Sequence, residues 1–214
     1  MATEPTEGRS VPLVERVKNI LMTPKTEWPR IDAEPATIGG IYRSYVVILA
    51  AIPPICLLIG LMIFGMPGLG SLIQFSPGYL IGQAILTYLL SLGSVYVLAL
   101  IIEALAPTFG GQKDRVSAFK VAAYSSTAAW VVGIFYLVPF LAILGILGLY
   151  SLYLLYLGLP VLMKVPADKA VGYVVAVIVA SIILYLIVGT IAGRMMTTMM
   201  PAQAPSSITV NLPG

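Results

Sequence analysis

The side chains that most often carry catalysis and metal binding are scarce in this 214-residue sequence. It contains no histidine and a single cysteine, Cys56. A Ser-His-Asp triad, a Cys-His pair, an intrachain disulfide, and zinc or haem sites of the usual kinds therefore lack the residues they need. An enzyme would have to rely on the carboxylates of Glu103, Asp114 or Asp168. We interpret these as groups that balance nearby basic residues, and we predict no catalytic residue, no metal and no cofactor.

Hydroxyl and amide groups offer the other candidate chemistry. Gln83, Thr87, Ser91 and Ser94 recur at helical spacing along one segment. A second polar group, in the Ala-Tyr-Ser-Ser-Thr stretch of residues 123–127, contributes Tyr124, Ser125 and Thr127. We predict that this polar interior hydrogen-bonds between helices. The alternative is a polar path through a small-solute transporter or a lipid-handling protein.

The elements that must position these side chains are long and apolar. Hydrophobic residues make up 59% of the chain and charged residues 10%, a composition typical of membrane proteins. A helix that crosses a bilayer needs about 20 apolar residues. Five segments fit, at residues 41–64, 79–102, 118–137, 140–163 and 171–192. The fold class that we predict is an all-α membrane protein, a bundle of five transmembrane helices preceded by a short interfacial amphipathic helix.

The basic residues fall in alternate connections between these segments. The N-terminal region, the connection near residue 115 and the connection near residue 165 carry eleven of the twelve, and Arg194 alone follows the fifth span. By the positive-inside rule the N-terminus is cytoplasmic and the C-terminus lies outside. These basic residues are dispersed and lack interleaved aromatic side chains, which excludes nucleic acid as a partner.

The region before the first span predicts a further helix. Leu13, Val14, Val17, Ile20 and Leu21 share one helical face and Glu15, Arg16, Lys18 and Asn19 the other. Such a helix lies on the cytoplasmic leaflet or against the bundle, with Trp28 as a second interfacial anchor. The predicted division is a disordered N-terminus (1–9), a cytoplasmic interfacial segment (10–39), the five-span domain (40–194) and a disordered extracytoplasmic tail (195–214).

Proline and glycine mark features within the spans. Pro53 and Pro54 remove backbone donors inside span one and predict a kink, with freed carbonyls near Leu49 and Ala50 that a neighbouring helix must satisfy. The pairs Gly78-x-x-x-Gly82 and Gly189-x-x-x-Gly193 have the spacing of close helix packing.

Two regions of the chain resemble the bacterial branch of the YIP-domain proteins, relatives of the eukaryotic Ypt/Rab-interacting membrane proteins. The first is the entry segment ILMTPKTEWPRIDAEP at residues 20–35. The second runs from FGGQ (109–112) through AAYSST (122–127) and Val138-Pro139 to YLGLP (156–160) and VPADKA (165–170). The resemblance implies a five-helix bundle in the bacterial inner membrane, with no cofactor.

For the eukaryotic members of that family, the resemblance implies a role in membrane trafficking through contacts with small GTPases and sister proteins. The Asp-Leu-Tyr-Gly-Pro signature before the first span is absent here, which speaks against GTPase binding. We therefore expect a non-enzymatic scaffold or adaptor that contacts the lipid bilayer and a membrane-protein partner or a second copy of itself. The predicted contacts are Trp28, Phe109, Lys113 and Arg115. An intramembrane enzyme using Glu103 is the third hypothesis.

Overall fold

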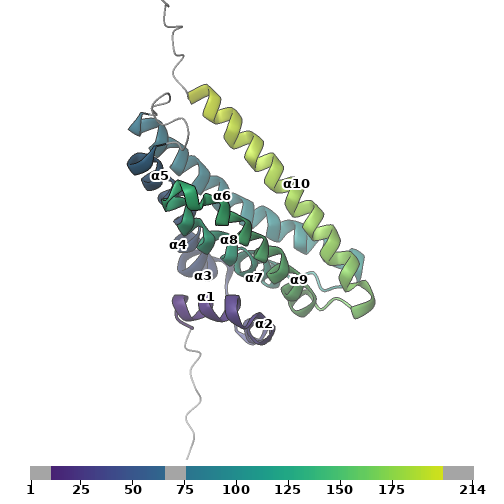
Figure 1. Ribbon diagram of the computed structural model, residues 1–214. Coiled ribbons are helices and arrows are strands. Elements are labelled where there is room, and N and C mark those ends of the chain that lie inside the picture. Colours follow the sequence, from purple (N-terminus) through teal and green to yellow (C-terminus); the bar gives the residue numbers. More distant parts are fainter. Residues whose placement is uncertain (1–10, 66–75, 200–214) are drawn as a thin grey trace, which may run out of the picture.

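The computed structural model describes residues 11–65 and 76–199, with side chains as far as Arg194. Within them, five helical segments are long and apolar enough to cross a membrane: Ile38–Phe64, Pro77–Phe109, Arg115–Leu137, Pro139–Met163 and Ala167–Arg194. They run side by side as an elongated bundle (Figure 1). The predicted all-α membrane fold with five spans is confirmed.

The first span is a chain of short helices, and the second is nearly continuous. Span one comprises α3 (Ile38–Ile41), a π-helical turn η1 (Tyr42–Val46), α4 (Val47–Leu49) and α5 (Ile52–Phe64). The break at residues 50–51 comes directly before Pro53 and Pro54, which occupy the first turn of α5, where the missing N–H groups cost little. Span two is α6 (Pro77–Leu105) followed by η2 (Ala106–Phe109).

Spans three and four form the tight hairpin that the short connection requires. Span three comprises α7 (Arg115–Ser125), α8 (Thr127–Val132) and the 3-10 helix η3 (Gly133–Leu137). Val138 is extended, and span four follows as the 3-10 helix η4 (Pro139–Leu149) and α9 (Tyr150–Met163). Span three is the central element, because 61% of the residues in its 18-residue apolar stretch are buried, compared with 28% or less in the other four spans.

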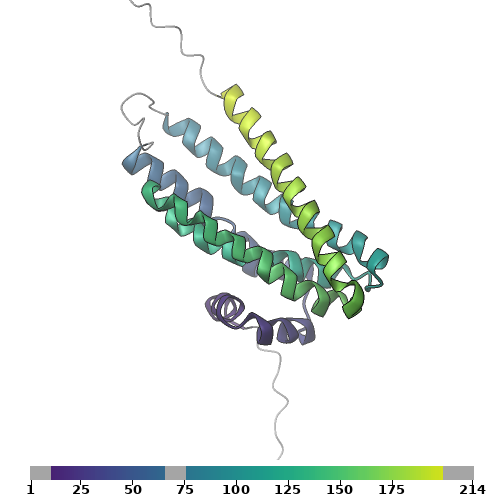
Figure 2. The same ribbon diagram turned by 45° about the vertical axis from the view of Figure 1, so that its right-hand side comes forward.

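The fifth span, α10 (Ala167–Met199), lies along one side of the bundle (Figure 2). It extends past residue 195, the predicted start of a disordered tail. Residues 200–214 and 1–10, which include the rest of that tail and the predicted disordered N-terminus, lie outside the described residues.

Below the bundle, α1 (Leu13–Met22) and α2 (Pro24–Ala33) form a separate layer that we call the platform (Figure 1). Of the two placements expected for the amphipathic helix, α1 adopts the one against the bundle, with Ile20 fully buried. Most of the predicted inward face is confirmed, because Leu13, Val17 and Leu21 also pack against the core. Two positions differ: Arg16 is buried and Val14 is 78% exposed. Arg16 turns inward because the carboxylates of Glu27 and Glu34 pair with it.

The glycines that permit close packing are not the predicted ones. Among the described residues, a Cβ added at Gly78, Gly82, Gly189 or Gly193 would meet no atom within 4 Å, so these pairs make no close helix contact there. A Cβ at Gly60 would lie 2.5 Å from the carbonyl oxygen of Tyr136. Spans one and three therefore touch backbone to backbone near their far ends.

We predict that Gly60→Ala destabilises the bundle by about 2 kcal/mol, because the added methyl group meets backbone atoms that have no room to move. The matched control is Gly82→Ala, which adds the same methyl group to open space on a transmembrane helix. Thermal unfolding of the purified protein in detergent measures both. Equal melting temperatures for the two variants would contradict the packing at Gly60.

Candidate functional site

A buried arginine lies at the centre of the interface between the platform and the bundle. Arg16 is 4% exposed. Its Nη1 donates to Glu27 Oε1 at 2.5 Å, and Nη2 donates to the Glu34 carboxylate. Its guanidinium carbon lies 5.7 Å from the ring centre of Tyr124, from span three. Arg16 thus links α1, α2, the segment after α2, and the central span.

Buried ions are stable only when they are paired and hydrogen-bonded. Burial by itself lowers the pKa of Arg16, but the hydrogen bond and charge of Glu34, with the charge of Glu27, raise it overall. The guanidinium therefore stays charged. Glu27, 1% exposed, also has the guanidinium of Arg30 at 3.6 Å. Two carboxylates and two guanidinium groups form a balanced cluster at this interface.

Two lysines from the bundle hold the end of α2. Lys120 of span three is 5% exposed, and its Nζ donates to the carbonyl oxygens of Ile31 at 2.7 Å and Glu34 at 2.6 Å. Lys164, after α9, pairs with Asp32. The last carbonyls of a helix lack partners within the helix and carry its partial negative charge. The Lys120 ammonium group satisfies both requirements, whereas Lys164 binds the side-chain carboxylate of Asp32. The sequence pattern gives no sign of this role, because the carbonyls and the carboxylate that the two lysines bind lie far away along the chain.

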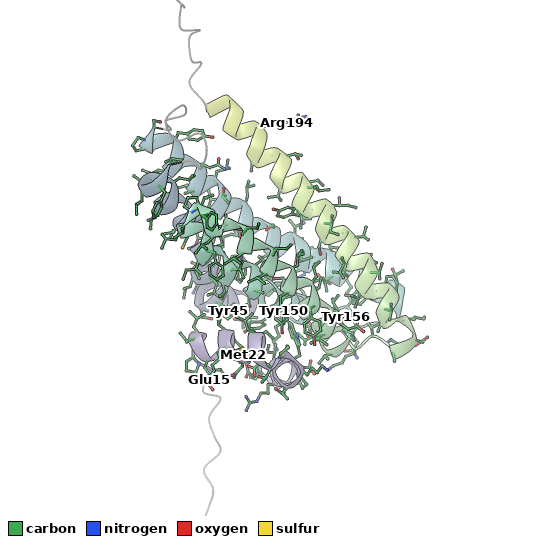
Figure 3. The ribbon with its side chains drawn as sticks, viewed as in Figure 1. Glu15, Met22, Tyr45, Tyr150, Tyr156 and Arg194 are labelled. Carbon is green, nitrogen blue, oxygen red and sulfur yellow. The ribbon has the colours of Figure 1, made fainter. Side chains whose placement is uncertain are left out.

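Apolar contacts complete the docking of the platform. Trp28 is 1% exposed, and its ring occupies the space beside Gly158 of α9, where a Cβ would lie 2.6 Å from Trp28 Cζ2. Tyr150, at the start of α9, donates its hydroxyl to the carbonyl oxygen of Leu21 at 3.0 Å. Tyr45 and Tyr150 lie at the end of the bundle that faces the platform, and Arg194 lies at the opposite end (Figure 3). The expectation that Trp28 anchors in the headgroups is wrong, because its ring packs inside the protein.

The other predicted contact residues differ in exposure. Lys113 is exposed. Arg115 is also exposed but donates from Nε to Glu103 at 2.8 Å, which ties span two to span three. Phe109 is partly buried, with its ring centre 5.4 Å from that of Tyr173 on α10. Glu103 and Phe109 therefore both contribute to packing at this end of the bundle.

The predicted polar interior separates into two groups. Near the platform, Tyr45 of span one shares a hydrogen bond with Thr127 at 2.7 Å and meets the Tyr124 ring edge-on at 4.8 Å. On span two, Gln83 donates to Thr87 at 3.4 Å, and Ser94 donates to the carbonyl oxygen of Ser91 at 2.9 Å. These span-two bonds stay within the helix. Ser125, 3% exposed, donates to the Ala122 carbonyl oxygen at 3.3 Å.

A family comparison covers both the platform and the bundle. The family model of the Yip1 domain matches residues 18–189, which include α2, the whole of spans one to four, and span five as far as Gly189. The chain belongs to the Yip1 domain family. Searches of the curated proteins and of the solved structures found no match to it. The match begins within α1, so the second half of α1 and the whole of α2 fall inside the Yip1 domain.

The described residues of this Yip1 domain hold no group of three or more Cys, Asp or Glu side chains that fits a metal ion. The acidic residues brought together at the platform, Glu27 and Glu34, are instead occupied by Arg16. The platform end of the molecule therefore presents a structured surface, which charged groups of the bundle hold in place.

We predict that Lys120→Met loosens the platform, because Met has a similar length but donates to neither carbonyl oxygen. The loss of two hydrogen bonds to a charged donor corresponds to about 3 kcal/mol. Hydrogen exchange of the amides in residues 13–33 measures the effect and should become faster. Lys113→Met, the control at an exposed position, should leave the exchange of these amides unchanged. Identical protection in the two variants would show that Lys120 does not hold the platform.

A pH effect is expected at the start of α7. Burial alone would raise the pKa of Asp114, but the hydrogen bonds from the Ser117 hydroxyl and the amides of Val116 and Ser117 lower it overall. The folded pKa therefore lies below the ordinary value of about 3.9. The ionised Asp114 carboxylate therefore stabilises the folded protein fully above that ordinary pKa. This stabilisation is lost as the pH falls through the lower pKa of the folded state. Hydrogen exchange of the amides in the first turn of α7, measured against pH in the native protein and in Asp114→Ala, tests this effect. If the pH dependence persists in Asp114→Ala, another group causes it.

Proposed function

We propose that this Yip1 domain protein is a non-enzymatic scaffold or adaptor of the bacterial inner membrane, whose platform faces the cytoplasm and contacts a membrane-protein partner. The observation that carries the proposal is the fixed platform. Arg16, Lys120 and Lys164 hold α1 and α2 in one position against the bundle. A surface held in this way is preorganised, so a partner that binds it does not meet the entropic cost of ordering it.

The distribution of charge supports the orientation. The platform and the connections beside it carry most of the basic residues, whereas Arg194 lies at the far end of α10. Lys and Arg accumulate on the cytoplasmic side of membrane proteins. We therefore place the N-terminus in the cytoplasm and the C-terminus outside.

The outward face of α1 is the best candidate for the contact. Val14 and Met22, at 78% and 75% exposure, lie on one helical face with the exposed Lys18 between them. Two large apolar side chains around a cation suit an amphipathic partner segment that carries an acidic residue. Lys113 and Arg115 extend the same end of the protein as further contacts. Trp28 is buried against α9 and Phe109 packs on Tyr173 of α10, so in this proposal they hold the fold and do not touch the partner directly.

The alternative of a small-solute path along span two has less support. The hydrogen bonds from Gln83 and Ser94 remain within α6. Thr127 shares a hydrogen bond with Tyr45, and the Tyr124 ring packs against Arg16. The predicted polar residues thus do not gather along a single route.

Photocrosslinking in cells tests the scaffold proposal. A photoreactive residue is placed at Met22 or at Lys113, one at a time, and adducts are identified by mass spectrometry. We expect one discrete protein adduct from both positions, and a several-fold lower yield of it when Lys18→Glu is combined with the Met22 probe. The control is Ile183, 52% exposed on α10 far along the bundle. Lipid or self adducts alone, or the same protein adduct from Ile183, would contradict the adaptor role.

A further inference from the structure

A cavity of about 430 Å³ lies between α10, spans three and four, and Leu98 of span two. Hydroxyl groups line it from three spans: Ser125, Ser126, Tyr136, Ser151, Ser181 and Tyr185. Gly145 and Gly148 on η4 leave room on the side of span four. A smaller cavity of about 140 Å³ shares Ser126, Ser181 and Tyr185 with it and extends the space toward Ser94.

The central span is broken where it borders this cavity. Helix α7 ends at Ser125 and α8 begins at Thr127, so Ser126 interrupts the helical hydrogen bonds. The amide of Ala129 donates to Ser151 Oγ at 3.0 Å, and Ser126 Oγ donates to the Ala122 carbonyl oxygen at 2.8 Å. Irregular backbone at membrane depth is tolerated only where protein buries it or where it lines a cavity. A broken helix beside a hydroxyl-lined cavity is the arrangement of a membrane ligand site.

The hydroxyl groups keep the capacity to accept hydrogen bonds. Ser126 and Ser181 each use their hydrogen on a backbone carbonyl of their own helix, the latter on Val177 at 2.6 Å. A hydroxyl oxygen has two lone pairs besides its one donated hydrogen. The cavity can therefore accept a hydrogen bond at Ser126 and Ser181, and Ser151, whose oxygen accepts from the Ala129 amide, can donate one.

The cavity opens toward the lipid along α10. The first half of α10 is packed against the bundle, with Tyr173 and Val177 fully buried and the Tyr173 hydroxyl bonded to the Ile102 carbonyl oxygen at 2.8 Å. Farther along, Ile182 is 48% and Tyr185 77% exposed, although both line the cavity. The occupant can therefore enter from the bilayer.

We propose that this cavity binds one uncharged lipid with a free hydroxyl group, of the diacylglycerol type. None of the described side chains that line it is charged, so it offers no partner for a phosphate headgroup. The volume of about 430 Å³ falls in the range of sites for small ligands, which suits the glycerol end of such a lipid. The acyl chains extend into the bilayer through the opening beside Ile182 and Tyr185. This inference is independent of the proposed contact at the platform.

Photolabelling in nanodiscs tests the proposal with the full-length protein. The probe is a diacylglycerol that carries a diazirine and an alkyne on one acyl chain, and the comparison probe is a phosphatidylcholine with the same chain. We expect the diacylglycerol probe to label peptides that line the cavity, with competition by unlabelled diacylglycerol. Equal labelling by both probes, or diacylglycerol labelling spread evenly over all lipid-facing helices, would overturn it.

Variants locate the site. Ser181→Phe fills the cavity and should lower the labelling about tenfold, whereas Ile183→Phe adds a ring at an exposed position outside the lining and should leave it unchanged. Tyr185→Phe removes a hydroxyl from an exposed side chain without endangering the fold, and should lower the labelling about threefold. Labelling that is unchanged both in Tyr185→Phe and in a correctly folded Ser181→Phe would overturn the site. If Ser181→Phe does not fold, the result for Tyr185→Phe alone decides.

Discussion

The buried guanidinium of Arg16 is the interaction on which the platform depends. A charge removed from water is tolerated only beside opposite charges and hydrogen-bond partners, and Glu27 and Glu34 supply both. This requirement fixes how α1 is rotated, how α2 lies beside it, and where the chain turns toward the first span. Tyr124 places the central span against the same group. One side chain therefore couples the layer outside the bundle to the helix at its centre.

The same rule for polar groups organises the spans, where backbone atoms have no water to bond. A carbonyl near the break in the first span is satisfied from α6, because the Tyr88 hydroxyl donates to the carbonyl oxygen of Val47 at 3.0 Å. This carbonyl lies before Leu49 and Ala50, where the prolines led us to expect the freed groups. The Tyr42 hydroxyl in turn donates to the carbonyl oxygen of Leu92 on that helix. Tyrosine suits this task because its ring packs as an apolar body while its hydroxyl reaches a carbonyl. Breaks in spans one and three are thus stabilised by side chains from other spans.

Packing and charge divide the length of the bundle into two regions. At the platform end, α10 and span two are joined through Tyr173 and Ile102, and Glu103 pairs with Arg115. Farther from the platform, α10 buries few of its side chains, and the cavity beside Ser126 and Tyr185 opens there. A well-packed platform end that suits protein contacts and a less tightly packed region around the cavity that admits a lipid are compatible within one Yip1 domain.

The amino-acid pattern alone determined the number of spans, their limits to within a few residues, the hairpin at Val138, and the likeness to the YIP-domain family. These properties depend on hydrophobic length and on local motifs, which are visible along the chain. Tertiary structure decided which polar residues meet. Arg16, Lys120 and Trp28 all looked like surface residues, but each is buried, because partners distant in sequence make burial favourable. The glycines at close contacts, Gly60 and Gly158, were decided in the same way: a small residue matters only where another chain segment approaches, and no local pattern specifies that approach.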